Sequence, residues 1–189
     1  MKSLTDLPVV TLDWRTSGAP APGFELHSNL GVVATLTFLD EAQDLARIET
    51  AEGTWTFKHA GLLNALVTIR EEGSHADLAV FHPSSLGHGK LEFADGARFD
   101  WVGLPGNTAG TESGGAFVDH EGMPYLRIHA HSTRTEKTPT LPYYGEVELG
   151  TPPKARWRHG LLAAFGWYLL VTEHLMGRQA IAAETCLRL

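Results

Sequence analysis

Apolar and polar residues alternate along much of the chain between residues 24 and 149. In the segment 32–39, for example, Val32, Ala34, Leu36 and Phe38 fall on one face of an extended chain. Successive side chains of a strand point to opposite faces, so this period predicts strands that bury one face. We therefore predict a mainly-β chain of about ten or eleven short strands. The same period recurs at Ala46 and Ile48, Trp55 and Phe57, Leu78 and Val80, Leu91 and Phe93, Phe99 and Trp101, Leu126, Ile128 and Ala130, and Val147 and Leu149.

Acidic residues followed by glycine stand between several of these segments. Glycine adopts the positive φ that tight hairpin turns require, so these pairs predict turns in an antiparallel arrangement. The N-terminal residues 1–23 end in a stretch rich in proline and glycine, which predicts a lead-in segment before a single domain over residues 24–189. The acid-glycine pairs are Glu52-Gly53, Glu72-Gly73, Asp95-Gly96 and Glu121-Gly122.

The alternation stops at Pro152-Pro153, and residues 161–171 are apolar except for the Tyr168 hydroxyl. A helix that is apolar on every face must be enclosed on every side. Because a bilayer span needs roughly 20 apolar residues, this segment is too short to cross one, and we predict no transmembrane span. A closed sheet around the helix covers all of its faces and leaves no sheet edge exposed. We predict a central helix over about residues 158–176, with a second short helix after Gly177 from Arg178 to about Arg188.

Charge and cysteine content limit the partners and the setting. The chain has 189 residues and a formal net charge of −7, which disfavours nucleic acid as a partner because binding to phosphates needs cationic side chains. Cys186 is the single cysteine, so no disulfide forms within the chain. The first residues, Met1 to Asp6, lack the apolar run of a secretory signal. We therefore expect a cytoplasmic protein, placed at the periphery of a membrane if it binds lipid.

Aromatic strands that follow acid-glycine turns, at residues 51–57, 94–101 and 120–126, and the apolar segment 161–171 near the C-terminus together form a pattern that resembles a known family. That family is the tubby C-terminal-like superfamily, which includes the plant LURP-one-related proteins and the phospholipid scramblases. The resemblance covers residues 24–176 and implies a closed antiparallel barrel of about twelve strands around a hydrophobic C-terminal helix. The chain lacks a scramblase-type calcium-binding segment and a cysteine cluster for palmitoylation. We expect a non-enzymatic protein without a cofactor that binds phospholipid head groups or a protein partner.

The one concentration of basic residues precedes the apolar helix. Lys154, Arg156, Arg158 and His159 stand there with Trp157 among them. At the mouth of a barrel they could bind the phosphate of a lipid head group, and a bound anion would be favourable at a helix N-terminus. The alternative interpretation is a cationic stretch that flanks a buried helix and binds no ligand.

A different class of function is indicated by His129-Ala130-His131. Strand alternation places the two imidazoles on one face, and with Glu136 they resemble the first metal motif of cupins, which predicts a metal-dependent barrel enzyme using His129, His131 and Glu136. The alternative is that Tyr125, Arg127, His129 and His131 form the wet face of a strand.

The third possibility is a lipocalin-like carrier of small ligands, with the helix packed outside an open barrel. The three classes differ in what fills the barrel, since we expect a helix inside it to leave no cavity for a small ligand. Residues 82–89 could pair a serine with a histidine for nucleophilic catalysis, or could form a connecting loop.

Overall fold

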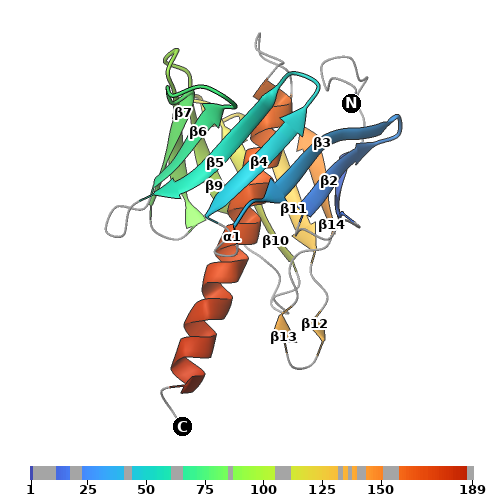
Figure 1. Cartoon of the computed structure of the whole chain (residues 1–189), viewed down its shortest axis with the longest axis vertical. Coiled ribbons are helices and arrows are strands. Elements are labelled where there is room, and N and C mark those ends of the chain that lie inside the picture. Colours follow the sequence, from blue (N-terminus) through green and yellow to red (C-terminus); the bar gives the residue numbers. More distant parts are fainter. Residues whose placement is uncertain are drawn as a thin grey trace.

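A computed structural model describes residue 1 and residues 12–17, 23–40, 44–60, 66–84, 87–104, 112–131, 134–135, 138–139, 144–150 and 158–186, with side chains at all of these except 134–135, 138–139 and 174–186. Twelve of the strands form one closed antiparallel barrel, and two short strands form a separate hairpin beside it (Figure 1). The elements are β1 (Leu12–Thr16), β2 (Gly23–Ser28), β3 (Gly31–Phe38), β4 (Leu45–Thr50), β5 (Thr54–Ala60), β6 (Leu66–Glu71), β7 (Ala79–Pro83), β8 (Gly89–Phe93), β9 (Arg98–Leu104), β10 (Glu112–Val118), β11 (Pro124–His131), β12 (Arg134–Thr135), β13 (Thr138–Pro139), β14 (Tyr144–Leu149) and α1 (Arg158–Cys186).

The barrel follows the order β1-β14-β11-β10-β9-β8-β7-β6-β5-β4-β3-β2, in which most neighbours in the sheet are also neighbours in the chain. Short hairpin connections explain this order, since two-stranded antiparallel units form around tight turns. The predicted turn glycines Gly73, Gly96 and Gly122 have positive φ, whereas Gly53 does not. The mainly-β, closed-barrel prediction is confirmed.

The barrel is closed by a strand that lies inside the segment predicted as a lead-in. β1 pairs with β14 on one side and with β2 on the other, so the ring has no free edge between them. Leu12 and Trp14 on this strand are fully buried. The prediction that residues 1–23 only lead into the domain is therefore wrong. A short strand next to proline and glycine gives little local signal, and one of its two partners, β14, comes from a distant part of the chain.

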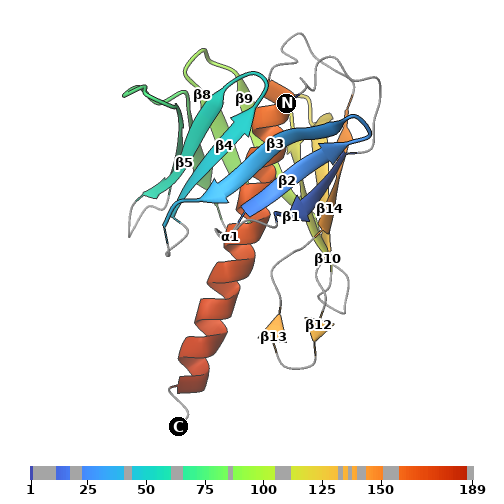
Figure 2. The same cartoon turned by 45° about the vertical axis from the view of Figure 1, so that its right-hand side comes forward.

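The apolar segment lies inside the barrel, as predicted. Figures 1 and 2 show α1 running through the ring of strands from one end to the other and continuing beyond it. Phe165 and Trp167 have no exposed surface, and the surrounding residues from Leu161 to Val171 are buried apart from Leu169, which is half-buried. The helix is longer than predicted: it continues through Gly177 to Cys186 as one element, and no separate second helix follows. A glycine in a helix costs only about 1 kcal/mol relative to alanine, so it does not by itself end one.

Aromatic rings join the helix to the strands around it. Phe165 contacts Phe57 and Phe81 edge-on, with ring centroids 5.0 and 5.4 Å apart. Trp167 stacks on Trp14 of β1, with ring centroids 5.7 Å apart and an angle of 10° between the planes. Each such aromatic pair stabilises the fold by about 0.5–1.5 kcal/mol beyond the contribution of the area that it buries. The helix thus packs against strands on opposite sides of the barrel.

Two strand glycines make room for tryptophan rings in this core. A Cβ at Gly115 would lie 2.0 Å from Cζ2 of Trp101, and a Cβ at Gly145 would lie 2.2 Å from Cζ3 of Trp167. No real side chain fits at those distances. Glycine weakens an isolated strand, but β10 and β14 need it here because the interior has no room for both a side chain and the tryptophan ring.

The buried face of β7 is the opposite of the predicted one. Ala79 and Phe81 point into the core, whereas Val80 is half-buried between them and Leu78, just before the strand, is half-buried and packs against the core. Every residue from 78 to 81 is apolar, so alternation did not distinguish the two faces. The pairing of β7 with β6 and β8 sets its register instead, and a shift of one residue exchanges the faces.

Candidate functional site

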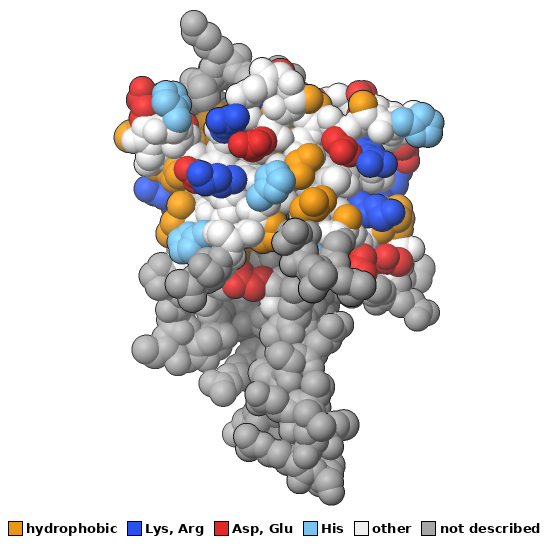
Figure 3. Space-filling model, turned by 90° about the vertical axis from the view of Figure 1, so that its left-hand side faces the viewer, with side chains coloured by type: hydrophobic (Ala, Val, Ile, Leu, Met, Phe, Trp, Pro, Cys, Tyr) orange, Lys and Arg blue, Asp and Glu red, His pale blue; other side chains and the backbone are white. Residues whose placement is uncertain are grey.

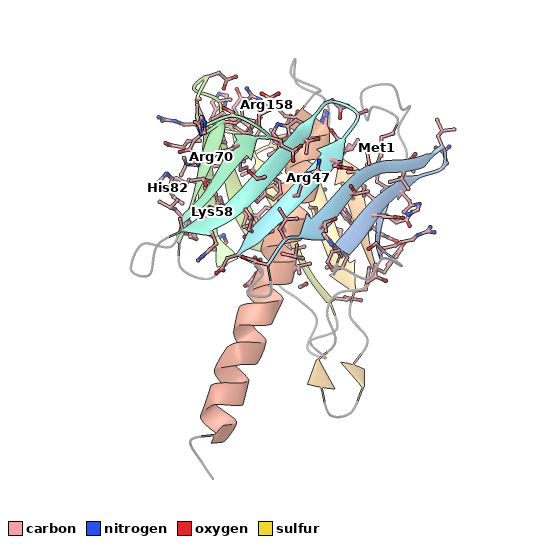
Figure 4. All side chains as sticks on the ribbon, in the orientation of Figure 1. Met1, Arg47, Lys58, Arg70, His82 and Arg158 are labelled. Atoms are coloured by element: carbon pink, nitrogen blue, oxygen red, sulfur yellow. The ribbon has the colours of Figure 1, made fainter. Side chains whose placement is uncertain are left out.

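The two ends of the barrel offer different chemistry, and we name them by the helix. At the start end, where α1 begins, the Arg158 side chain is buried and forms an ion pair with Asp95 of the β8–β9 turn. Its guanidinium carbon also lies 4.4 Å from the centroid of the Phe93 ring. Figure 4 shows Arg158 at this end of the barrel. The guanidinium therefore ties the first turn of the helix to the neighbouring hairpin.

His159 is the second described member of the basic cluster and is also buried. Its ring stacks on Tyr125 of β11, with centroids 4.7 Å apart and an angle of 16° between the planes. Burial raises the pKa of Tyr125 to about 12, against the opposing effect of the nearby Arg158 charge. Tyr125 was assigned to the wet face of its strand by alternation, and that assignment is wrong because the start of β11 turns its side chain onto the helix.

The predicted head-group site is therefore only partly open to a ligand at the described residues. Arg158 and His159 contact protein groups inside the barrel mouth, and Lys154 and Arg156 lie outside the described residues. The β4–β5, β6–β7, β8–β9 and β10–β11 turns share the start end because neighbouring strands are antiparallel. These turns carry Glu52, Glu72, Asp95 and Glu121, of which Glu72 and Asp95 form ion pairs with Arg47 and Arg158.

We expect Asp95→Asn to lower the free energy of unfolding by about 1–3 kcal/mol, because it removes the counter-charge from a buried guanidinium. Urea denaturation followed by circular dichroism measures the change. Asp100→Asn is a matched control, since Asp100 is an exposed carboxylate on β9. Equal stability of the two variants would contradict a structural role for the Arg158–Asp95 pair.

The two histidines of the predicted metal motif lie on the outer face of β11. Both are half-buried, and their neighbours across β14 are Glu146 and Tyr144. Nδ1 of His131 lies 4.0 Å from a carboxylate oxygen of Glu112. Glu136 lies outside the described residues, and among those that are described no three His, Cys, Asp or Glu side chains are grouped to hold a metal ion.

Ion pairs neutralise the arginines on the outer wall of the barrel. Arg47, for example, bonds Glu72 and Glu49, which together raise its pKa. Figure 3 shows basic and acidic side chains next to one another on the face over β5 to β8. Each arginine whose side chain is described has an acidic neighbour, which offsets its charge. The pairs are Arg15–Asp13, Arg47–Glu49, Arg47–Glu72, Arg70–Asp77, Arg98–Glu92, Arg127–Glu148 and Arg158–Asp95.

A cavity of about 270 Å³ opens at the exit end, where α1 leaves the barrel. We call it the exit cavity. Its walls are mainly apolar and come from four elements: Val67 of β6, Phe81 of β7, Trp101 of β9 and Leu169 of α1. The expectation that a helix inside the barrel leaves no room for a small ligand is therefore wrong. The helix fills the centre of the barrel, and the cavity lies beside Leu169, which is half-buried and packs against the edge of the core.

Polar groups line the exit cavity as well: His59, Ser84, His88, Thr172 and Glu173. The serine and histidine flagged within residues 82–89 thus lie at one site. The hydrogen bond between them is a backbone bond, in which Ser84 N–H donates to the His88 carbonyl at 2.8 Å and closes the β7–β8 connection. The arrangement suits the binding of a small molecule, because mainly apolar walls with a few polar groups are typical of ligand pockets.

Sequence reasoning found Ser84 and His88 but missed the other residues of the exit cavity. Residues 59, 67, 101 and 169 belong to separate elements, and no spacing along the chain relates them. The lipocalin-like interpretation, with the helix outside the barrel, is wrong in its geometry because α1 lies inside.

Comparison with protein-family models, with curated proteins and with solved structures yields no match for this chain. Over the part of the chain that is described, no helix combines the length and the apolar character that a bilayer crossing requires. The barrel and its exit cavity therefore provide the physical basis for assigning a function.

Proposed function

We propose that this chain is a non-enzymatic binding protein with a tubby-like, helix-filled barrel, and that it takes a small, mainly apolar molecule into the exit cavity. The observation that carries the proposal is the cavity itself, which has apolar walls of Val67, Phe81, Trp101 and Leu169. Its volume of about 270 Å³ is close to the lower limit of about 300 Å³ for small-molecule sites. A single aromatic ring or a short alkyl chain matches that size.

The position of the cavity supports binding without large rearrangement. Three of the walls are strands of a closed barrel, whose backbone hydrogen bonds hold them in place. The fourth wall, Leu169, belongs to a helix that is anchored deeper in the core by Phe165 and Trp167. A site that is formed before the ligand arrives loses less entropy on binding.

The start end supports a head-group role less well. Two of the four basic residues proposed for it, Arg158 and His159, are engaged with Asp95 and Tyr125 at the barrel mouth. A phospholipid head group would therefore depend on Lys154 and Arg156. For this reason we place the ligand at the exit end.

Titration of the isotope-labelled protein with 1-hexanol, followed by two-dimensional NMR, tests the proposal. We expect saturable shifts at Val67, Phe81 and the Trp101 indole. Leu169→Phe partly fills the cavity and should weaken binding by about tenfold or more, since crowding by a few atoms in an apolar pocket costs about 1–3 kcal/mol.

Leu149→Phe is the matched control, because Leu149 is likewise a half-buried leucine packed against the core but does not line the exit cavity. It should leave the affinity unchanged. Shifts that do not saturate, or equal effects of Leu169→Phe and Leu149→Phe, would refute the proposed site.

A further inference from the structure

The exit cavity has a carboxylate at its rim. Among the described residues that line it, Glu173 is the charged one when histidines are counted as neutral. The carboxylate lies beside the β7–β8 connection, where a Cβ at Gly87 would be 3.1 Å from its Oε1 atom. Gly87 also has a φ of +71°, which a larger residue would adopt only with strain. The backbone thus leaves the space that the Glu173 carboxylate occupies at the rim.

Two further carboxylates lie at the same end of the barrel, which also carries the exposed Lys58 of β5. Asp40 and Asp44 lie in the β3–β4 connection, and both add to the effect of burial in raising the pKa of Tyr168 on α1. Tyr168 precedes the cavity-lining Leu169 in the helix. Negative charges beside a low-dielectric opening attract cations to it.

We propose that the ligand of the exit cavity is an organic cation, an amine or a quaternary ammonium compound with a small apolar body. This inference rests on the proposed function and specifies the ligand of the same site. The cationic head lies against Glu173, and the apolar body lies between Leu169, Val67 and the rings of Phe81 and Trp101. Aromatic faces attract cations as well as apolar groups, so the walls favour both parts of such a molecule.

The hydrogen-bonding groups of the cavity also suit a donor. The Thr172 hydroxyl donates its hydrogen within the helix, to the carbonyls of Tyr168 at 2.9 Å and Leu169 at 3.1 Å. Its oxygen can then only accept a hydrogen bond from a ligand, as can the Glu173 carboxylate. An ammonium group has donors and no acceptors and matches these two groups, whereas a carboxylate ligand would find side-chain donors at Ser84, His59 and His88 instead.

The test compares three ligands with the same alkyl chain and different heads: hexylamine, 1-hexanol and hexanoate. Their dissociation constants are measured by the NMR titration described above. The pH is near 7, at which a primary amine is protonated. We expect hexylamine to bind about threefold to fivefold more tightly than 1-hexanol, because an exposed ion pair contributes up to about 1 kcal/mol. Hexanoate should bind more weakly than 1-hexanol by a similar factor.

Glu173→Gln should remove these differences, so that the three ligands bind with similar affinity. Glu112→Gln is the matched control, since Glu112 is an exposed carboxylate at the exit end that does not line the cavity. Equal affinities for the three ligands on the unmodified protein, tighter binding of hexanoate, or a preference for the amine that survives Glu173→Gln would overturn the cationic-ligand inference. Saturable binding of 1-hexanol alone would still support the cavity as a site, so the two proposals fail separately.

Discussion

Trp14→Ala is expected to lower the free energy of unfolding by about 3–5 kcal/mol, as is typical when a large buried aromatic residue is truncated. Trp14 has no exposed surface, and it stacks on Trp167 of the central helix. It also belongs to β1, the strand that closes the ring between β14 and β2. The loss therefore acts on the core and on barrel closure together. Denaturation in urea, followed by tryptophan fluorescence and circular dichroism, measures it.

Arg15→Ala is the control in the same strand. Its side chain is 58% exposed and pairs with Asp13 on the surface, so we expect a change of no more than about 1 kcal/mol. If Trp14→Ala cost no more than Arg15→Ala, β1 would not be part of the barrel, and residues 1–23 would be the lead-in segment that the sequence pattern predicts.

Phe165→Asp is expected to abolish folding at neutral pH. The substitution removes ring contacts with Phe57 and Phe81 and places a carboxylate where the side chain has no exposed surface. Losing the ring costs about 3–5 kcal/mol, and an unpaired buried charge adds several kcal/mol more. Together they are comparable to the whole stability of a typical domain, about 5–15 kcal/mol. Circular dichroism and the dispersion of the NMR spectrum report the outcome.

Leu169→Asp separates burial in the core from mere position on the helix. Leu169 lies one turn from Phe165 but is half-buried at the exit cavity, where a carboxylate can reach water. We expect this variant to fold, with a loss of about 1–3 kcal/mol. The arrangement of the helix in the barrel would be contradicted if Phe165→Asp folded, or if Phe165→Asp and Leu169→Asp both failed to fold.

Local sequence patterns predicted far less of the candidate site than of the fold. Ser84 and His88 belong to residues 82–89, whose serines and histidines indicate a possible site. Trp101 and Glu173 have no local pattern that relates them to that site. The basic cluster at residues 154–159 did carry a signal, and burial changed its meaning for Arg158 and His159. A charged residue next to an apolar helix has the same sequence signature whether it binds a ligand or an internal counter-charge such as Asp95.

The sequence by itself determined the mainly-β character, the hairpin turns and the enclosure of the apolar helix. These features depend on alternation, on glycine after an acidic residue and on an all-apolar segment too short for a bilayer, and each acts over a few residues. Only the tertiary structure decided that β1 closes the ring, that Ala79 and Phe81 are the buried residues of β7, and that a cavity remains beside Leu169. These outcomes depend on register, on ring closure and on the fit of side chains from strands that are far apart in the sequence. A pattern over a few residues does not specify such long-range relations.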